Sequence, residues 1–279
     1  MLLKKQLSSL QAILIAFCAV APLLVFGQSE PITTLNGSDP ITMRSHVNLD
    51  LESYYFFDGS TYYAIRPGFN YGLQNQKHLV GMSIPIMHNI FSGNYGGFEN
   101  TTGVGDLKMK YVAVPVMKKE ALGLQRVSTY LEITAPTGEA VLGRGAGVWQ
   151  YKPGLLLTYR LAPNVSFYPE MNFLFSFGDA NSQGDGFPDT EDPEADQPLR
   201  SLRLAFPAVV EIPDWDGWVL MSAIYTRSLE AKEDAMFLRV DVGRMLGDQT
   251  GGSIRISKYI FGQPRLNVVV QASFQFFLR

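Results

Sequence analysis

The sequence predicts an all-β chain, an antiparallel up-and-down transmembrane barrel of about 12 strands that follows a cleaved signal peptide. Three observations predict it: an export signal, strands that alternate over unusual lengths, and a regular difference between long and short connections. The composition agrees, since only 18% of the residues are charged, against roughly 25% in ordinary soluble domains. The formal net charge of -3 gives no basic face for nucleic acid, so nucleic-acid binding is not expected.

The N-terminus has the layout of a secretory signal peptide. Lys4 and Lys5 precede an apolar run over residues 10–26, and small residues lie just before Gln28. A membrane anchor is the competing interpretation, but the run is shorter than the roughly 20 residues that a spanning helix needs and contains a proline. We therefore expect residues 1–27 to be removed. The only cysteine, Cys18, lies in this segment, so disulfides are not expected in the mature chain.

The segment 163–179 shows the strand pattern most clearly. Its apolar side chains share one parity and most polar side chains share the other; the apolar set is Val165, Phe167, Met171, Phe173, Phe175 and Phe177. Successive residues of a strand point to opposite faces, and soluble strands average about 5 to 6 residues. A strand this long with one apolar and one polar face suits hydrocarbon outside and water inside.

Twelve segments of this kind follow one another. They lie at residues 46–57, 61–73, 77–87, 104–117, 125–136, 146–160, 164–177, 199–212, 216–228, 234–245, 251–261 and 265–278. Their lengths match a tilted strand that crosses a bilayer, and no stretch after the signal is long and apolar enough for a spanning helix. We expect residues 28–45 to form an N-terminal periplasmic segment and residues 46–279 to form the barrel.

The connections set the orientation. The longest follow the third, fifth and seventh strands, whereas the connections after even-numbered strands are short. Outer-membrane barrels carry long loops outside and short turns in the periplasm. The N-terminus is therefore expected on the periplasmic side, and the chain in the bacterial outer membrane.

Six prolines fall within the expected strands, at positions 67, 85, 115, 153, 169 and 207. A proline removes a ladder hydrogen bond and normally belongs at strand edges or bulges. Either the strand boundaries are shifted at these points, or the wall is locally interrupted. An interrupted wall could open sideways and let an apolar solute pass into the bilayer.

Charged side chains on the polar parity are expected to face the lumen. The set is Asp50, Glu52, Arg66, Lys108, Lys110, Glu132, Lys152, Arg160, Glu170, Arg203, Arg239, Asp241 and Arg255. One interpretation is a set of ion pairs that makes a narrow barrel rigid, with Arg203, Arg239 and Arg255 paired to acids such as Asp50, Glu170 or Asp241. The other is a mixed-charge constriction that selects solutes.

The acidic loop after the seventh strand suggests a calcium site. Asn181, Gln183, Asp185 and Asp189 alternate around two glycines, much as calcium loops space their oxygen ligands, and more carboxylates lie within residues 179–196. No other cofactor is expected. The competing interpretation is a solvated acidic loop, or one that bridges lipopolysaccharide through divalent ions.

Two segments resemble a known family: "GVGDLKMKYVAVPV" at 103–116 and "LEITAPTGEAVLGRGAGVWQYKPGLLLTYRL" at 131–161. A Gly-x-Gly-Asp-Leu opening and a Pro-Thr-Gly turn before a Trp-bearing strand resemble the MetA-pathway phenol-degradation family. The matching positions are Gly103, Gly105, Asp106, Pro136, Thr137, Gly138, Gly145 and Trp149. The resemblance implies an outer-membrane barrel that transports small, often hydrophobic compounds.

The function expected is therefore a channel or transporter for small hydrophobic or aromatic molecules. Its expected partners are outer-membrane lipid, lipopolysaccharide, the barrel-assembly machinery and hydrophobic solutes. A structural or adhesive barrel without transport activity and, outside the membrane, a soluble ligand-binding barrel are the alternatives. An outer-membrane lipid-modifying enzyme is a further alternative, but His46, His78 and His88 lie apart and no Gly-x-Ser-x-Gly motif occurs, so no catalytic residue is expected.

Overall fold

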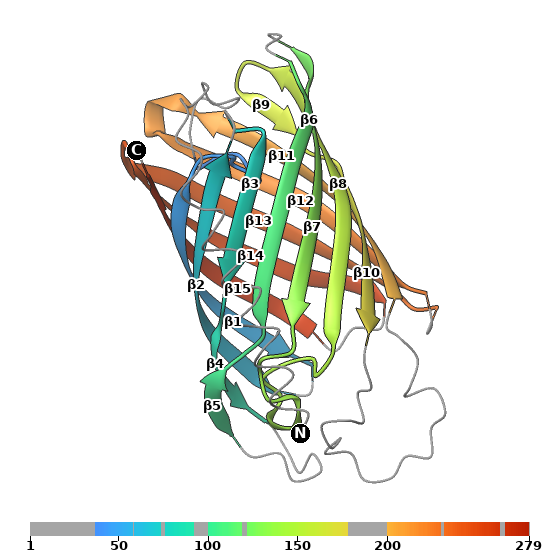
Figure 1. Ribbon diagram of the computed structural model, residues 1–279. Helices are drawn as coiled ribbons and strands as arrows, with labels where there is room; N and C mark the ends of the chain where they lie inside the picture. Colours follow the sequence, from blue (N-terminus) through green and yellow to red (C-terminus); the bar gives the residue numbers. More distant parts are fainter. Residues whose placement is uncertain are drawn as a thin grey trace.

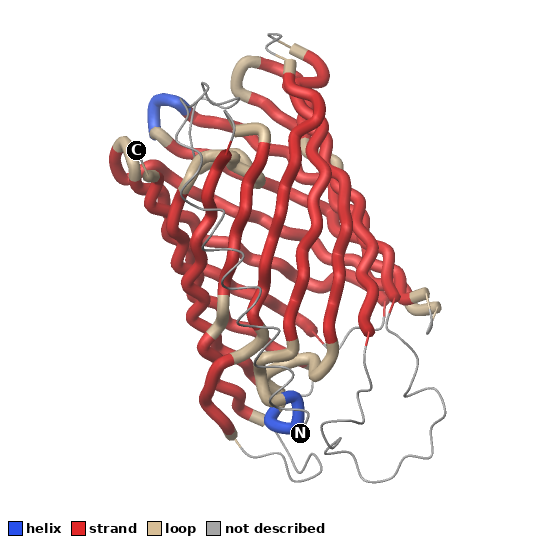
Figure 2. The backbone as a smooth tube through the Cα atoms, in the orientation of Figure 1, coloured by secondary structure: helices blue, strands red, loops and turns tan. Residues whose placement is uncertain are grey.

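The chain forms a closed antiparallel β-barrel (Figures 1 and 2). The computed structural model describes residues 37–57, 59–73, 76–91, 100–118, 122–177, 200–229, 232–262 and 266–278. Its strands are β1 (His46–Phe56), β2 (Thr61–Leu73), β3 (His78–Ser83), β4 (Ile86–Ile90), β5 (Thr101–Val104), β6 (Leu107–Met117), β7 (Gly123–Ala135), β8 (Trp149–Ala162), β9 (Val165–Phe167), β10 (Glu170–Phe177), β11 (Arg200–Ile212), β12 (Gly217–Ser228), β13 (Asp234–Gly247), β14 (Thr250–Gly262) and β15 (Leu266–Phe277). The wall closes where β1 pairs with β15 on one side and β2 on the other.

Three wall strands are each divided into two, so these 15 strands make a 12-strand barrel, as predicted. β3 and β4 follow each other along β2, β5 continues into β6, and β9 and β10 follow each other between β8 and β11. Pro85 lies in the first division and Pro169 in the third. A wall that is locally interrupted, rather than a shifted strand boundary, accounts for these two prolines.

The other four prolines lie inside strands. Pro115 occupies a bulge in β6, where the register with β7 shifts between Ala113 and Val116. Pro67, Pro153 and Pro207 keep their register with one neighbouring strand. Pro67 and Pro207 each lie beside a division on the other side, and their carbonyls accept bonds from Ile84 N–H at 3.3 Å and Tyr168 N–H at 2.8 Å.

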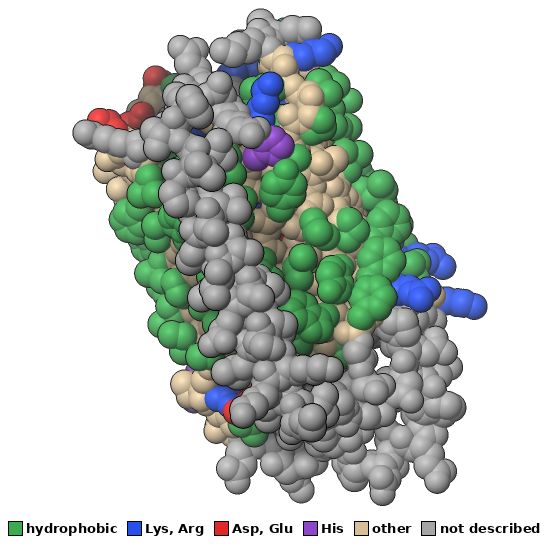
Figure 3. Space-filling view, viewed as in Figure 1, with side chains coloured by type: hydrophobic (Ala, Val, Ile, Leu, Met, Phe, Trp, Pro, Cys, Tyr) green, Lys and Arg blue, Asp and Glu red, His purple; other side chains and the backbone are tan. Residues whose placement is uncertain are grey.

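The two faces of the wall differ as the alternation predicts. The outer face carries exposed apolar side chains, among them Leu51, Ile65, Ile86, Met221, Ile254 and Phe276. Figure 3 shows hydrophobic side chains across the visible wall, with Lys and Arg gathered toward its two ends. This outer face suits hydrocarbon, and the chain is an outer-membrane barrel. No helix in the described residues is long and apolar enough to span a membrane.

The two ends of the barrel differ in their connections. At one end, here called the short-turn end, the strands are joined by tight connections such as 163–164 and 248–249, and by the single-turn helix η4 (Pro213–Trp215). The other end, the long-loop end, carries the connections 91–100, 136–148 and 178–199, of which the second contains η2 (Ala140–Leu142). By the rule for outer-membrane barrels, the short-turn end faces the periplasm.

An apolar cluster fills the lumen toward the short-turn end. Its wall residues are Leu79, Val112, Val114, Tyr130, Leu156, Tyr168, Val209, Trp218 and Leu220. Ile41 and Met43 complete the cluster, so the chain before β1 packs inside the barrel. Residues 37–45, here called the N-terminal plug, thus contact the lumen and belong structurally to the barrel, although their sequence suggests a separate periplasmic segment.

Candidate functional site: the barrel lumen

A belt of charged side chains lines the middle of the lumen. It holds seven cations and five carboxylates from the nine strands β1, β2, β6, β7, β8, β10, β11, β13 and β14: Arg66, Lys108, Lys110, Lys152, Arg203, Arg239, Arg255, Asp50, Glu52, Glu132, Glu170 and Asp241. Each lies on the same parity as the buried polar residues of its strand, such as Asn172 and Ser257. Twelve of the thirteen lumen-facing residues expected from the sequence are therefore brought together here, in what we call the charged belt. The thirteenth, Arg160, lies instead at the short-turn end, where it donates to the Pro163 carbonyl.

Three ion pairs join neighbours in the belt. Arg66 and Glu52 form a two-point pair, with Nε to Oε1 at 2.9 Å and Nη2 to Oε2 at 3.0 Å. Lys152 Nζ contacts Glu132 at 2.5 Å. Arg255 donates to Asp241 at 2.9 Å, which is one of the pairings expected from the sequence. All three join adjacent wall strands, so they stiffen the wall without crossing the lumen.

The remaining carboxylates of the belt accept from neutral donors. Glu170 receives Tyr130 Oη at 2.5 Å and Asn172 Nδ2 at 2.9 Å. Asp50 receives Asn48 Nδ2 at 2.9 Å. In the described part of the chain, neither has a cationic partner at ion-pair distance.

Four cations of the belt have no carboxylate at ion-pair distance among the described residues: Lys108, Lys110, Arg203 and Arg239. The pairing expected for Arg203 and Arg239 is therefore not formed; Arg239 makes only a 3.4 Å contact, from Nε to Ser257 Oγ. Seven cations against five carboxylates cannot all be paired, so the belt carries an excess of positive charge. This contrasts with the negative net charge of the chain.

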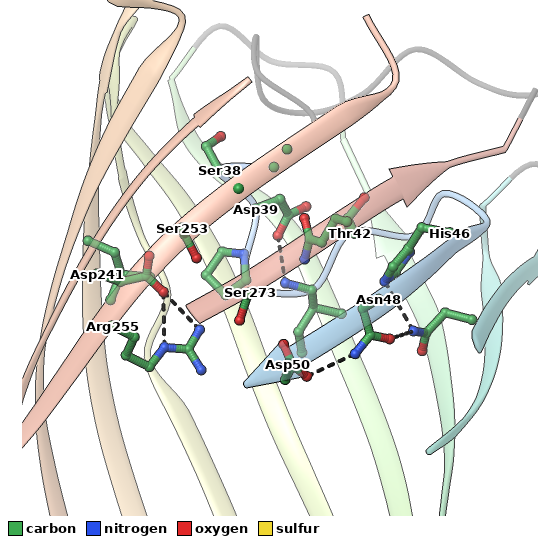
Figure 4. Close-up of a pocket in the computed structure, with 18 of the residues that line it drawn as sticks. Ser38, Asp39, Thr42, His46, Asn48, Asp50, Asp241, Ser253, Arg255 and Ser273 are labelled. Atoms are coloured by element: carbon green, nitrogen blue, oxygen red, sulfur yellow. Dashed lines mark hydrogen bonds and ion pairs between the residues drawn. The ribbon is translucent and has the colours of Figure 1, made fainter. Parts of the chain in front are cut away.

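Two cavities in the lumen are lined in part by residues of the charged belt. The larger has a volume of about 280 Å³ and lies between the N-terminal plug and strands β1, β2 and β12 to β15 (Figure 4). Ser38, Asp39 and Thr42 border it from the plug, and Asp50 and Arg255 border it from the wall. The smaller, about 150 Å³, is lined by Asn48, Asp50, Arg66, Asn70, Gly81, Met82, Ser83, Lys108, Lys110 and Glu132. Because four residues line both cavities, the two are neighbouring compartments of one lumen.

Buried polar contacts hold the N-terminal plug in place. Both oxygens of Asp39 accept from the guanidinium of Arg126 at 2.9 Å, and these side chains are only 7% and 2% exposed. Ser38 Oγ donates to Glu211 at 2.5 Å. The ring of Trp218 packs closely against the plug at Gly37, where a Cβ would lie only 2.5 Å from the ring. The plug therefore obstructs the periplasmic end.

Trp218 also packs flat against the wall. A Cβ at Gly243 would lie 2.2 Å from its Cζ2 atom, so only glycine allows the ring to approach the backbone of β13. Tyr130 covers Gly154 in the same way, with a hypothetical Cβ 2.3 Å from its Cζ atom. An aromatic ring over a strand glycine replaces the missing side-chain packing.

The connection 136–148 folds back over the long-loop end. Asn89 Nδ2 donates to the carbonyls of Leu142 at 3.1 Å and Gly143 at 2.7 Å. Arg144 donates to the carbonyl of Thr102 at 2.5 Å and also binds Glu139. The loop thus covers the edge of β5 and narrows the outer mouth of the lumen.

Asp106 anchors this loop. Its two carboxylate oxygens accept the backbone N–H groups of Gly138 at 2.9 Å and Ala146 at 2.7 Å. Thr137 Oγ1 donates to the carbonyl of Gly105 and accepts from Leu107 N–H. A Cβ at Gly145 would lie 2.4 Å from Asp106 Oδ1, so glycine is required for this approach. Most of the motif residues behind the family resemblance meet here and fix the loop.

The sequence of residues 37–45 does not predict the plug, although the sequence of the wall strands contains a signal for it. Leu79, Val112 and Trp218 are apolar residues on the lumen parity, where a water-filled pore would carry polar side chains. The expected calcium ligands Asn181, Gln183, Asp185 and Asp189 lie outside the described residues, so that site remains a prediction. Within the described ranges, no group of three or more His, Cys, Asp or Glu residues could hold a metal ion.

Replacing Arg255 by methionine is expected to lower the free energy of unfolding by about 2–3 kcal/mol, because Asp241, 4% exposed, loses its ion-pair partner. The effect is at the low end for a broken buried pair, since the Arg255 side chain is 29% exposed. Urea unfolding of the barrel in detergent measures it. Arg239→Met is the matched control, because Arg239 has no carboxylate partner in the described residues, and it should leave stability nearly unchanged. Equal destabilisation by both would contradict this account of the belt.

No protein-family model matches the chain, and no curated protein matches it. Several solved structures match the fold of the chain. The COG4313 outer membrane channel from Pseudomonas putida F1 aligns with a TM-score of 0.64 and 11% identity, over 86% of this chain and 98% of that one. NanC porin aligns with a TM-score of 0.54 and 12% identity, over 82% and 100%. KdgM porin aligns with a TM-score of 0.51 and 8% identity, over 84% and 99%.

At these identities the likeness shows the fold, which is that of outer-membrane channels and porins. Membership of the MetA-pathway family stays a prediction.

Proposed function

We propose that the barrel passes small hydrophobic or aromatic molecules across the outer membrane, and that these molecules leave the lumen through the side of the wall. The observation that carries the proposal is the line of proline breaks beside the lumen cavity. The fold shared with channels and porins and the resemblance to the MetA-pathway family support it. The proposal assigns no catalytic residue.

The wall has adjacent proline breaks across β2, β3/β4 and β5/β6. Pro67 and Pro85 offer no N–H to the ladder, and the breaks lie side by side: Ile84 N–H binds the Pro67 carbonyl, and Gly105 N–H binds the Pro85 carbonyl at 2.8 Å. We call this region the proline patch. Fewer ladder bonds hold these strands than a regular sheet would have, so separating them costs less free energy here than in an unbroken part of the wall.

Hollows lie on both sides of the proline patch. On the outside, an apolar hollow of about 330 Å³ is bordered by exposed Leu51, Ile65 and Ile86. On the inside, the cavity of about 150 Å³ is bordered by Arg66 and Ser83. The ion pair between Arg66 and Glu52 joins the two, because Glu52 also borders the outer hollow. An apolar solute that reaches the inner cavity therefore has a short route to the bilayer.

A structural barrel without transport is the competing function. It is favoured by the obstruction of both ends, by the N-terminal plug on one side and the loop 136–148 on the other. A lateral route accounts for the same observation, because it bypasses the plug.

The test is a disulfide that locks the proline patch. Ala64 and Met87 lie directly opposite each other on β2 and β4, a placement that suits a disulfide. In cells that make the Ala64→Cys/Met87→Cys barrel, uptake of the hydrophobic dye N-phenylnaphthylamine should fall to the level of cells without the barrel. Reductant should restore it.

The matched control is Ser257→Cys/Val269→Cys, which joins facing residues of β14 and β15 far from the patch. This disulfide should leave dye uptake unchanged. Equal uptake by locked and reduced patch variants would exclude the lateral route. Wild-type barrel that adds no dye uptake to the cells would favour the structural function.

A further inference from the structure

The smaller lumen cavity has the composition of an anion site. Lys108 and Lys110 both border it, together with the amides of Asn48 and Asn70. Neither lysine has a carboxylate at ion-pair distance among the described residues. Two ammonium groups without ion-pair partners are expensive to hold in a confined lumen, and a bound anion would offset that cost.

The acids near the two lysines are already engaged. Glu132 binds Lys152 at 2.5 Å, and Asp50 accepts from Asn48. Arg66, also on the cavity wall, brings a third cation, whose own partner Glu52 lies outside the cavity lining. The cavity therefore has three cations and two engaged carboxylates on its wall, and its net charge is positive.

Lys110 is held so that its donors remain available. Its Nζ lies 5.6 Å from the centre of the Tyr130 ring, a cation–π contact that fixes the ammonium group without using an N–H donor in an ion pair. The Tyr130 hydroxyl is itself fixed by its bond to Glu170. Lys108 and Lys110 are two residues apart on one strand, so both project from β6 into the lumen at roughly 6–7 Å spacing.

We propose that this cavity binds a small organic carboxylate, with Lys108 and Lys110 as the charged contacts and the second amide N–H of Asn48, whose first N–H binds Asp50, as a neutral donor. The inference deepens the proposed function and rests on it, because it adds aromatic acids to the hydrophobic and aromatic molecules that the barrel would pass. A carboxylate supplies the charge that the lysines lack, and an ammonium–carboxylate contact is a strong charge-assisted hydrogen bond.

The experiment measures binding rather than passage, so its result is independent of whether the barrel transports. Sodium benzoate and benzyl alcohol, which share a ring and differ in charge, are titrated calorimetrically into the purified, folded full-length barrel. Benzoate should bind and benzyl alcohol should bind at least about tenfold more weakly. The Lys108→Gln/Lys110→Gln variant should lose benzoate affinity by at least about tenfold.

Arg227→Gln is the matched control, because it removes a cation at the rim that has only a 3.6 Å contact with Asp234. It should bind benzoate like the wild type. Heat-modifiable gel mobility verifies that each variant is folded, and the single variants Lys108→Gln and Lys110→Gln replace the double variant if that one does not fold. The proposal would be overturned if the wild-type barrel did not bind benzoate or bound both probes equally. It would also be overturned if the lysine variant kept the wild-type affinity for benzoate. Loss of dye uptake on locking the proline patch, with or without benzoate binding, reports on the proposed function alone.

Discussion

Replacing Asp39 by alanine is expected to undock the N-terminal plug and raise the single-channel conductance several-fold, roughly in proportion to the lumen area released. The substitution leaves Arg126, 2% exposed, without its carboxylate partner. Breaking one side of a buried ion pair costs about 3–5 kcal/mol, which is enough to change the docked fraction by about a hundredfold or more. Planar-bilayer recordings of wild type and variant measure the conductance.

A thiol probe measures undocking independently. In a Cys18→Ser background, a cysteine in place of Met43, 3% exposed in the apolar cluster, should react slowly with a maleimide in wild type and about a hundredfold faster with Asp39→Ala. The double variant Asp39→Asn/Arg126→Met is the control, because it removes both charges and should restore much of the protection. If Asp39→Ala alone leaves conductance and labelling unchanged, the Asp39–Arg126 pair does not hold the plug.

Replacing Asp106 by alanine is expected to release the loop 136–148 at the opposite end. Asp106 accepts two backbone N–H groups of that loop, and each bond to a charged acceptor contributes about 1.5–3 kcal/mol. The Arg144 side chain is 11% exposed and bound to the Thr102 carbonyl and Glu139. Trypsin added outside intact cells should therefore cleave after Arg144 at least about tenfold faster in the variant.

Asp248→Ala is the comparison variant for this experiment, because Asp248 lies in the short turn between β13 and β14 at the other end. It should leave cleavage after Arg144 unchanged. Asp106→Asn should lie between, since its amide keeps one acceptor oxygen for the two N–H groups. Cleavage that does not respond to Asp106→Ala would show that Arg144 and Asn89 alone hold the loop.

The sequence predicts the wall well because each strand meets hydrocarbon on one face and the lumen on the other. The segment predicted at 61–73 coincides with β2, Thr61–Leu73. Divided strands are harder to predict from the sequence, because side-chain alternation continues across a break. The segment predicted at 77–87 contains β3, the proline break and the first residues of β4. Alternation reports which face a side chain occupies, whereas a break depends on which backbone groups find partners.

Alternation also predicts which charges face the lumen, but not which of them pair. Arg255 and Asp241 meet because β13 and β14 are in register at these residues, and the register follows from the tilt and stagger of the whole barrel. Arg203 and Arg239 have the same pattern in the sequence, yet the described residues offer them no ion-pair partner. The sequence does not predict the plug, because residues 37–45 have no periodicity and their burial depends entirely on distant wall strands.

The bond between Ser38 and Glu211 joins residues that are 173 positions apart. Asp39 pairs with Arg126 on β7. The hydrogen bond from Ser38 to Glu211 and the contact between Gly37 and Trp218 require β11 and β12, which come late in the chain. The contacts of the plug with Glu211 and Trp218 cannot form before β11 and β12 are in place. The N-terminal plug therefore has its full set of contacts only when most of the wall has formed. The pairing of β15 with β1 closes the barrel around it. A chain that has not yet added β11 and β12 to the wall therefore lacks two of the contacts that close the periplasmic end of the barrel.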